Sequence, residues 1–367
     1  MKVAFVNSMR SIGGGERWLL EVASGLGERG HDVAVVTRRD AELTAAAAHD
    51  GHRVLELPMS SDFDPPSVLR LATWLARERP DVVSVNVQRA VRIGCAAARL
   101  ARTGTVVERR GLNFPARPST LNRWIYGRCV SAVIANCGEI ARQMVDAGLV
   151  PPERVVVVPN GIDPARVPAG GGGAIREQLG IDRDTPLVAM VARLVRDKGH
   201  AYAFEAFGRL LGRHPRARLV LVGAGKLEGE LREKAARAAP VGSIVFLGAR
   251  DDVPAILDAA DVLLVSSLRE GMPHSVLEAM VAGTPVVATA VAGIPEMIRS
   301  GEDGILVPAA DPGAIAGALE SVLADRSHAE RLAESAGRRV RETFGLERMI
   351  TETERVFAAA VRGVVSS

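Results

Sequence analysis

Hydrophobic and polar positions follow a repeating pattern from the first residues of the chain. Short runs rich in valine alternate with longer stretches whose apolar residues recur at helical spacing. In the first half, the short runs predict strands at residues 3–7, 32–37, 53–57, 81–87, 105–109, 132–135 and 155–158. Because short buried strands separated by helical segments are typical of a parallel sheet with crossover helices, this half predicts a doubly wound α/β domain.

The same pattern restarts after a break. A turn cluster at residues 160–164 and four consecutive glycines at residues 170–173 interrupt it, and such sequences form joints or surface loops. We therefore predict one Rossmann-like domain over residues 1–168 and a second over residues 169–345. The second domain has predicted strands at residues 187–191, 218–222, 244–247, 262–265, 286–288 and 305–307, and the pattern of residues 311–361 is helical.

Residues 266–296, SSLREGMPHSVLEAMVAGTPVVATAVAGIPE, form the most informative segment. Their pattern predicts a turn, a short buried helix from about His274 to Gly283, and the next buried strand. Glu270 lies in the turn, and Glu278 lies in the second turn of the helix. A buried carboxylate needs a partner, which could be a structural arginine or the hydroxyl pair of a ribose.

The start of this predicted helix is a candidate anion site. The first N–H groups of a helix have no helical carbonyl partner, and they attract negative charge. The residues around this start are Gly271, Met272, Pro273, His274 and Ser275. One short segment thus offers a phosphate cradle between two carboxylates.

Two cations follow the first strand of the second domain. Arg193 comes directly after that strand, and Lys198 precedes a helix for which Asp197 is the expected N-cap. Doubly wound domains bind ligands at the carboxyl ends of their strands, and two cations there suit a diphosphate. Lys226 and Arg250 follow glycine turns after the next two strands and are further candidates.

The first domain has a glycine-rich turn after its first strand. Gly14 and Gly15 in this turn let a phosphate or a sugar approach the backbone closely. The glycines lack the G-x-G-x-x-G spacing, and the second strand ends on Arg38 and Arg39 instead of an acid. Both observations argue against a dinucleotide such as NAD.

The two glutamates with seven residues between them, followed by AMVAGTPVVAT and GIPE, resemble the retaining nucleotide-sugar glycosyltransferases of family 4, which have the GT-B fold. The resemblance implies that Arg193 and Lys198 hold the leaving diphosphate. It also implies that Glu278 binds the ribose and that Glu270 contacts the donor sugar.

The resemblance extends to other positions of the chain. It implies that the first glycine-rich turn, with Gly14 and Gly15, faces the donor phosphates and the acceptor, and that Lys226 and Arg250 lie near the nucleotide base. A final helix at about residues 346–367 is expected to cross back onto the first domain. Many family members carry a histidine where this chain has Arg110. An arginine there could meet an anionic acceptor, support the leaving diphosphate, or be a solvated surface residue.

Composition limits the alternatives. The chain has 367 residues, of which 47% are hydrophobic and 24% charged, as is ordinary for a globular protein with two domains. It has no apolar run long enough to span a membrane and no signal-peptide pattern, so a cytoplasmic location is expected. Three cysteines without C-x-x-C spacing argue against a disulfide framework or a zinc site.

Charge is unevenly distributed. Between Arg89 and Arg128 there are nine arginines and only one acid, Glu108, which predicts an anion-facing surface. Because few aromatic residues lie among these arginines, we do not expect a nucleic-acid partner. Residues 118–130 have a basic amphipathic helical pattern, which could lie on the inner face of an anionic membrane or pack on its own sheet.

These features predict a glycosyltransferase that moves a sugar from a nucleotide-diphosphate sugar to a hydroxyl of a glycan, lipid-linked or phosphorylated saccharide acceptor. The resemblance implies retention of the anomeric configuration. We expect no cofactor and no metal, since the cations can neutralise the diphosphate and no Asp-x-Asp is placed to bind Mg²⁺. Two alternatives remain open: another GT-B sugar-nucleotide enzyme, such as an epimerase, and a non-catalytic nucleotide-sugar-binding subunit. The nucleotide, the sugar and the acceptor are not specified by the sequence.

Overall fold

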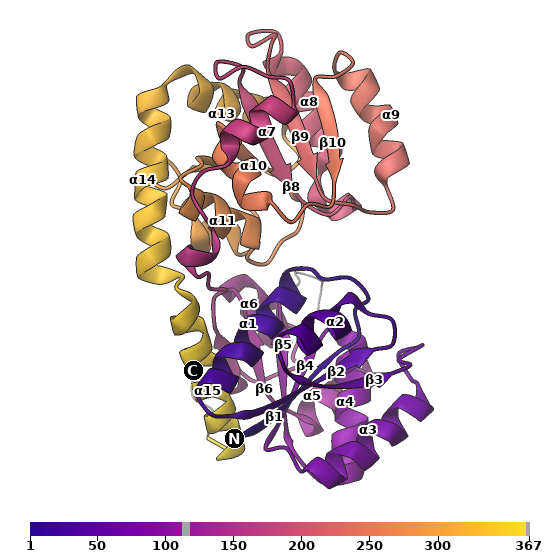
Figure 1. Ribbon diagram of the computed structural model, residues 1–367. Helices are drawn as coiled ribbons and strands as arrows, with labels where there is room; N and C mark the ends of the chain where they lie inside the picture. The colour runs from indigo at the N-terminus through magenta and orange to yellow at the C-terminus, as the bar shows by residue number, and fades with distance from the viewer. Residues whose placement is uncertain (112–117, 365–367) are drawn as a thin grey trace. The chain divides into compact units, whose positions relative to one another are not determined.

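The computed structural model describes residues 1–111 and 118–364, which divide into two compact units (Figure 1). The first unit is Met1–Asn160 with Leu346–Ser367, and the second is Gly161–Gly345. The predicted boundary after residue 168 lies inside the second unit, because residue 162 already pairs there. The Ile162 N–H donates to the Phe344 carbonyl over 2.8 Å.

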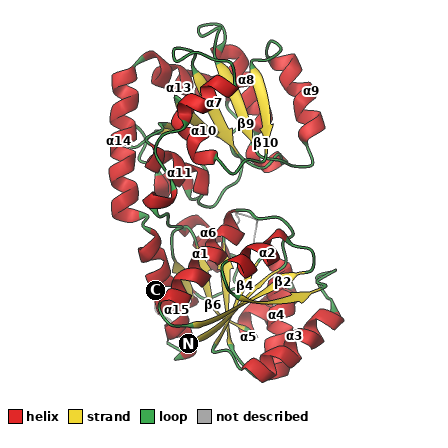
Figure 2. Cartoon of the chain, in the orientation of Figure 1, coloured by secondary structure: helices red, strands yellow, loops and turns green. Residues whose placement is uncertain are grey.

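A seven-stranded parallel sheet forms the centre of the first unit (Figure 2). Its spatial order is β3-β2-β1-β4-β5-β6-β7. Val3 of β1 pairs with Val33 on one side and with Val82 on the other, so the chain winds in both directions from β1. The strands are β1 (Lys2–Asn7), β2 (Asp32–Arg38), β3 (Arg53–Leu57), β4 (Val82–Asn86), β5 (Thr105–Arg110), β6 (Val130–Ala135) and β7 (Val155–Val157).

Helices cover both faces of this sheet. Right-handed crossovers from β1 and from β4 run in opposite directions along the sheet, so α1 and α4 lie on opposite faces. Helix α15 packs beside α1, and α3 packs beside α4. The helices are α1 (Gly14–Glu28), α2 (Glu42–His49), α3 (Pro65–Glu78), α4 (Gln88–Ala101), α5 (Thr120–Arg128), α6 (Gly138–Asp146), the 3-10 helix η1 (Pro152–Arg154) and α15 (Leu346–Val361).

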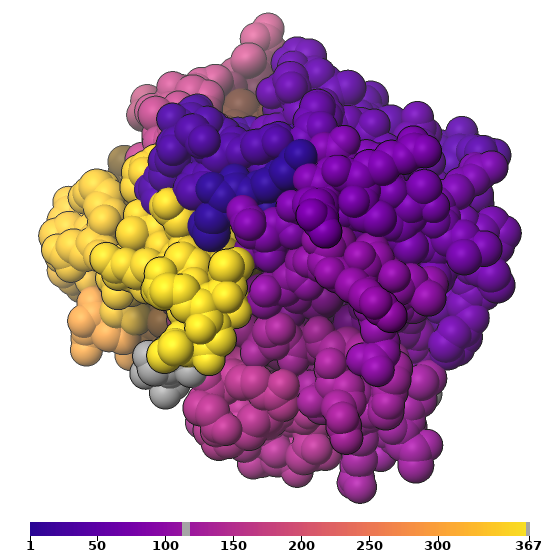
Figure 3. Space-filling model, turned by 90° about the horizontal axis from the view of Figure 1, so that it is seen from below, coloured from indigo at the N-terminus to yellow at the C-terminus, as the bar shows by residue number. Residues whose placement is uncertain are grey.

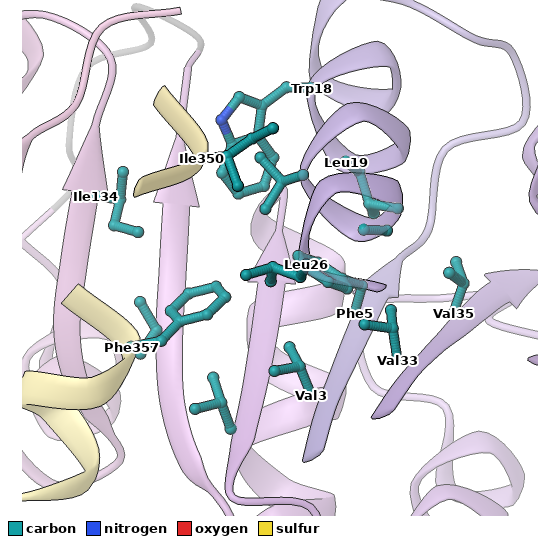
Figure 4. Packing of buried hydrophobic residues seen from close by; sticks show 14 of the residues in the cluster. Val3, Phe5, Trp18, Leu19, Leu26, Val33, Val35, Ile134, Ile350 and Phe357 are labelled. Carbon is teal, nitrogen blue, oxygen red and sulfur yellow. The ribbon is translucent and has the colours of Figure 1, made fainter. Parts of the chain in front are cut away.

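The two ends of the chain share the core of the first unit. The Phe5 ring of β1 lies 6.3 Å from the Trp18 ring of α1 and 6.1 Å from the Phe357 ring of α15, and all three are fully buried (Figure 4). Helix α15 buries Met349, Ile350 and other apolar residues that recur at helical spacing. Figure 3 shows the yellow C-terminal helix beside the indigo N-terminal residues.

The second unit has a six-stranded parallel sheet in the order β10-β9-β8-β11-β12-β13. Its winding also reverses, here between β8 and β11. Phe204 and Phe207 are fully buried in the core on one face. The strands are β8 (Leu187–Val191), β9 (Arg218–Val222), β10 (Ile244–Gly248), β11 (Val262–Val265), β12 (Val286–Thr289) and β13 (Ile305–Val307).

Most of the second unit's helices connect successive strands. Four of them have a proline at their first or second position, where the missing N–H costs nothing. The helices are η2 (Pro164–Arg166), α7 (Gly172–Gln178), η3 (Arg196–Lys198), α8 (His200–Leu210), α9 (Glu228–Ala238), α10 (Val253–Ala259), α11 (His274–Ala282), α12 (Ile294–Met297), α13 (Pro312–Ala324) and α14 (Arg326–Thr343).

The predicted doubly wound architecture is confirmed in both units, and every predicted strand is present within two residues of its expected bounds. The amphipathic segment at 118–130 forms α5, with the Ser119 hydroxyl as its cap, whereas Arg117 lies outside the described residues. Residues 365–367 of the predicted C-terminal segment also lie outside them.

Two local predictions are wrong. Asp197 is not an N-cap: it lies in η3, and Gly199, with φ at 66°, caps α8. The glycine run is not purely a loop, because α7 begins at Gly172. The Gly172 N–H donates to the Asp258 carboxylate over 2.9 Å, and a Cβ on Gly172 would lie 2.7 Å from the next backbone nitrogen, that of Ala259. This glycine therefore provides a close approach of α7 to α10.

Candidate functional site

In both sheets the direction of winding reverses between two neighbouring strands. Open α/β sheets bind ligands beyond the carboxyl ends of such a pair of strands. In the second unit these neighbours are β8 and β11. Arg193 follows β8, and Glu270 follows β11. The fold thus brings together residues that are more than 70 positions apart in the sequence.

Three loops at this edge hold one another in place. The Leu194 N–H donates to the Ala224 carbonyl over 3.0 Å, which joins the loop after β8 to the loop after β9. The Leu268 N–H donates to the Asp197 carbonyl over 2.8 Å, which joins the loop after β8 to the loop after β11. These bonds fix the backbone around the two predicted cations.

Glycines make this close packing possible. A Cβ on Gly199 would lie 1.9 Å from the Ser266 carbonyl oxygen, far inside contact distance. Gly223 has φ at 136°, and a Cβ there would lie 2.2 Å from the Ala192 carbonyl oxygen. Any side chain at either position would push the loops apart.

Lys198 and Glu270 form an ion pair at the junction of these loops. The Ser267 hydroxyl donates to the same Glu270 oxygen over 2.9 Å. The Lys198 and Glu270 side chains are 16% and 10% exposed, so the pair can be reached from solvent but is largely enclosed. Arg193 is exposed, and among the described residues no carboxylate forms an ion pair with it.

Helix α11 closes this edge. It begins at His274 after Pro273 and ends at Gly283, whose φ is 77°. Glu278 is half-buried in its second turn, and Val276 and Leu277 are fully buried. The helix start therefore lies directly after the loop that holds Glu270. The residues predicted around this start, Gly271, Met272, Pro273, His274 and Ser275, lie together on the turn and the first helical positions.

The two candidates for contact with the base differ. Lys226 is exposed on the loop after β9. Arg250 instead forms a two-bond pair with Asp252, with Nε donating over 2.7 Å and Nη2 over 2.5 Å. Its guanidinium therefore already has a carboxylate partner, Asp252, at the start of α10.

At the carboxyl edge of the first unit, the glycine turn passes directly into α1, which starts at Gly14. The Glu16 carboxylate accepts from the Gly13 N–H over 3.0 Å and from the Asn7 amide over 2.8 Å. The Asn86 amide at the end of β4 donates to the Gly15 carbonyl over 3.3 Å. The turn is thus fixed between β1 and β4, the strands where the winding reverses.

Arg109 is a residue of this edge that the sequence analysis did not single out. Its guanidinium lies 5.0 Å from the centre of the Trp18 ring, and its Nη2 donates to the Asn160 side chain over 2.8 Å. A Cβ on Gly111 would lie 2.1 Å from its Nη1. Burial lowers the pKa of Arg109 to about 10, although Glu16 and other groups partly oppose the shift. The sequence did hold a signal for this residue: side chains alternate along a strand, so Arg109 and Arg110 must point to opposite faces of the sheet.

Arg110 lies on the opposite face of β5, toward a buried carboxyl group. Its Nη1 donates to the Glu108 carboxylate over 3.4 Å, and the side chain is 17% exposed. Burial raises the pKa of Glu108, while Arg110 and a hydrogen bond from Tyr126 oppose this rise. Burial also raises the pKa of Tyr126. Arg110 is therefore a partly enclosed cation at the edge, not a solvated surface residue.

Comparison with known proteins shows the family of the chain. Family models match it in both units: Glycosyltransferase Family 4 over residues 12–166 and Glycosyl transferases group 1 over residues 173–339. The lipopolysaccharide core biosynthesis glycosyltransferase LpsE of Rhizobium meliloti (strain 1021) is 30% identical over 88% of this chain and 89% of that protein. The chain belongs to the family 4 glycosyltransferases.

Further relatives agree with this assignment. The UDP-Gal:alpha-D-GlcNAc-diphosphoundecaprenol alpha-1,3-galactosyltransferase of Escherichia coli is 28% identical over 89% of each chain. The crystal structure of Anabaena HepE in complex with UDP and glucose superposes with a TM-score of 0.88, at 22% identity, over 98% of this chain and 100% of that chain. This glycosyltransferase therefore has the GT-B fold.

Three further observations on this glycosyltransferase concern membrane spans, metal sites and cysteines. In residues 1–111 and 118–364, no helix combines the length and the apolar character needed to cross a bilayer. The same residues contain no group of three or more His, Cys, Asp or Glu side chains arranged to hold a metal ion. Cys95 and Cys137 are buried, Cys129 is partly buried, and none of the three forms a disulfide within the described residues.

Proposed function

We propose that this glycosyltransferase transfers a sugar from a uridine-diphosphate sugar to a hydroxyl of a lipid-linked or phosphorylated saccharide of the cell envelope. The reaction retains the anomeric configuration and needs no metal or other cofactor. Two relatives support this choice. The Escherichia coli enzyme is named for UDP-galactose and a diphosphoundecaprenol acceptor, and the Rhizobium enzyme is named for the lipopolysaccharide core.

The observation that carries the proposal is the Lys198–Glu270 pair beside Arg193 and the start of α11. Breaking the bond between sugar and phosphate leaves negative charge on the diphosphate. Two cations and the N–H groups of a helix start are the donors that stabilise such charge. The site therefore suits departure of a nucleoside diphosphate.

The ion pair also links donor binding to the state of the Glu270 carboxylate. In the structure, Lys198 and Ser267 both donate to one Glu270 oxygen. A bound diphosphate would compete for the Lys198 ammonium and leave the carboxylate able to accept from hydroxyls of the donor sugar. Donor binding thus prepares the group that orients the sugar.

Metal independence follows from the same charges. Arg193 and Lys198 supply the positive charge that Mg²⁺ supplies in metal-dependent transferases. Transfer measured with excess EDTA should equal transfer measured with added Mg²⁺. A large loss of rate in EDTA, restored by Mg²⁺, would reject this part of the proposal.

The acceptor is assigned to the first unit, at the edge formed by the glycine turn and β5. Gly14 and Gly15 offer backbone groups there, and Arg110 offers a partly enclosed cation. An anionic group on the acceptor, such as its phosphate, would pair with Arg110. Exchange to Arg110→Lys should keep some activity, whereas Arg110→Gln should raise the KM of a phosphorylated acceptor more than that of a neutral one.

Donor binding can be tested with a thermal-shift panel of UDP, GDP, ADP and their sugars. A ligand that binds only the folded protein stabilises it by about 2.7 kcal/mol at one hundred times its Kd. We expect UDP and one UDP-sugar to give the largest shifts, and labelled sugar to appear on an added acceptor. Conversion of the donor without acceptor would indicate an epimerase, and binding without turnover would indicate a non-catalytic subunit.

Glu278 provides a residue-level test of the donor site. A carboxylate in the second turn of α11 can accept from both hydroxyls of the ribose, so Glu278→Ala should weaken UDP binding at least tenfold, about 1.4 kcal/mol, by calorimetry. Glu302→Ala, a change at an exposed carboxylate of the same unit, is the matched control. Unchanged UDP affinity in Glu278→Ala would remove the ribose assignment.

A further inference from the structure

Three large apolar side chains are exposed on the helices that flank β5. Leu100 at the end of α4 is 60% exposed, Trp124 of α5 is 50% exposed, and Leu121 is 37% exposed. Leu121 and Trp124 are three positions apart, so they lie on one face of α5. The opposite face of α5 holds the buried Ile125 and Tyr126, so the exposed face is not needed for packing.

Arginines surround these apolar residues. The Arg99 guanidinium lies 5.6 Å from the centre of the Trp124 ring, which places the end of α4 beside α5. Arg123 and Arg128 are exposed on α5. We call the six residues the α4–α5 patch: Arg99, Leu100, Leu121, Arg123, Trp124 and Arg128.

The patch has no compensating acids. Among the described residues, none of its three arginines forms an ion pair with a carboxylate, whereas the nearby Arg89 and Arg92 both pair with Asp62. Glu108 is the one acid from position 89 to 128, and it is buried in β5. The positive charge of the patch is therefore available to a partner.

This combination fits a particular partner chemistry. An exposed tryptophan lies at the headgroup level of a bilayer, with its apolar ring inside and its N–H toward water. Arginines beside it contact lipid phosphates while their stems cover apolar surface. Leucines add affinity for a bilayer but none for a nucleic-acid backbone, and a single exposed aromatic ring is a poor platform for stacking bases.

We propose that the α4–α5 patch docks this enzyme on a membrane surface rich in anionic phospholipid. Leu100, Leu121 and Trp124 enter the headgroup region, and the three arginines contact phosphates. The patch involves the end of α4, which lies toward the amino edge of the sheet, away from the carboxyl edge that carries Arg110. Docking therefore goes beyond the proposed function, and it would place the enzyme where lipid-linked acceptors are found.

The test is co-sedimentation of the full chain with vesicles of phosphatidylcholine alone and of an equal mixture with phosphatidylglycerol, from about 20 to about 500 mM NaCl. We expect binding only to the mixed vesicles, and binding that weakens as salt rises. Each arginine near an anionic surface contributes about fivefold to affinity, so Arg99→Gln with Arg123→Gln and Arg128→Gln should reduce binding about a hundredfold.

Variants separate apolar insertion from charge. Trp124→Gln with Leu121→Gln should reduce binding at least tenfold at any salt concentration while the charge is unchanged. The matched control is Leu69→Gln with Arg70→Gln and Arg77→Gln on α3, which removes similar exposed groups from a different surface. Thermal unfolding should be the same in all these variants.

Three results would overturn the proposal: no binding of the wild type to mixed vesicles at low salt, equal loss of binding in the α3 control, or binding to a duplex oligonucleotide that exceeds binding to vesicles and is lost in the arginine variant. Turnover with a water-soluble acceptor is measured separately. Since the patch variants should keep that turnover, failure of docking and failure of the transferase assignment are distinguishable.

Discussion

At the scale of single residues, the second unit concentrates unlike groups in a small space. Lys198 pairs with Glu270, His200 follows two positions later, and Arg193 lies on the same loop. Lys198, Glu270 and Arg193 carry the charges that a diphosphate would meet. Their separate contributions can be measured by exchange of one side chain at a time.

Arg193→Ala and Lys198→Ala should each lower kcat about 30- to 900-fold, which corresponds to the roughly 2–4 kcal/mol lost with one donor to a developing charge. The measurement is the steady-state rate with the nucleotide sugar that the thermal-shift panel selects. Arg196→Ala, an exposed cation of the same 3-10 helix, should keep wild-type rates. Near-normal turnover in both site variants would contradict the diphosphate assignment.

His200 makes stability depend on pH. Burial, followed by the nearby Lys198 charge, lowers the pKa of His200 to about 4 in the folded protein. The unfolded chain therefore binds more protons between pH 6.5 and 4, so the free energy of unfolding should fall as the pH falls through that window, by about 3 kcal/mol in all. Denaturant titrations at several pH values measure the free energy of unfolding. It should fall more steeply with falling pH in the wild type than in His200→Gln.

The control for this slope is His49→Gln, since the His49 side chain is 90% exposed. It should follow the wild-type curve at every pH. Parallel curves for wild type and His200→Gln would show that the imidazole does not gain a proton on unfolding.

The sequence predicted which residue types meet at the donor site but not how each is buried. The segment 266–296 and the cations Arg193 and Lys198 stood out because chemistry and spacing agreed. Arg109 was overlooked beside Arg110, since only the packing against Trp18 and Asn160 shows that Arg109 is the more deeply buried of the two. The pairing of Arg250 with Asp252 also depends on side-chain conformations that spacing does not determine.

At the scale of elements, glycines decide how closely helices and loops approach. In α1, a Cβ on Gly25 would lie 2.4 Å from the Cδ1 of Ile350 in α15, whereas a Cβ on Gly27 would meet nothing within 4 Å. The two glycines lie on one helix and differ in what surrounds them. They form a natural pair for an experiment.

Gly25→Ala should destabilise the first unit by about 1–3 kcal/mol, because the added methyl group overpacks the contact between α1 and α15. Gly27→Ala should be neutral or stabilise by up to about 1 kcal/mol, since alanine loses less backbone entropy in a helix. Denaturant unfolding measures both. Ile350→Val, which removes the clashing methyl group, should recover part of the Gly25→Ala loss, and a failure to do so would place the strain elsewhere.

Strands were easier to predict than the segments between them. Their valine-rich runs bury both faces, which only a parallel sheet covered by helices provides. The start of α7 and the cap of α8 were missed because a close approach in three dimensions, at Gly172 and Gly199, decides them. Val87 is a further case: its φ of 63° is unusual for a β-branched residue, and it lies directly after β4 at the point where the winding reverses.

At the scale of the whole molecule, the chain forms two units whose cores are separate clusters. Only the first contains residues from both ends of the chain. Its stability must therefore depend on α15, although the second unit ends before that helix begins.

Phe357→Ala should lower the free energy of unfolding of the first unit by about 3–5 kcal/mol, because it opens a cavity beside Phe5. Amide hydrogen exchange can follow each unit separately. We expect faster exchange in β1 and β6 and unchanged exchange in β8 and β11. Val361→Ala, at an exposed position of the same helix, is the control, and equal acceleration in both units would show that they unfold as one body.

The place of α15 in the first core has a consequence for synthesis on the ribosome. Residues 1–160 emerge well before α15, so the core they begin lacks its covering helix until residues 346–361 have been translated. At about 5–20 residues per second, the 185 residues of the second unit, from Gly161 to Gly345, add about 10–40 s of delay. During that time Phe5 and Trp18 lack Phe357 and Ile350, and the unit that starts second can finish folding first.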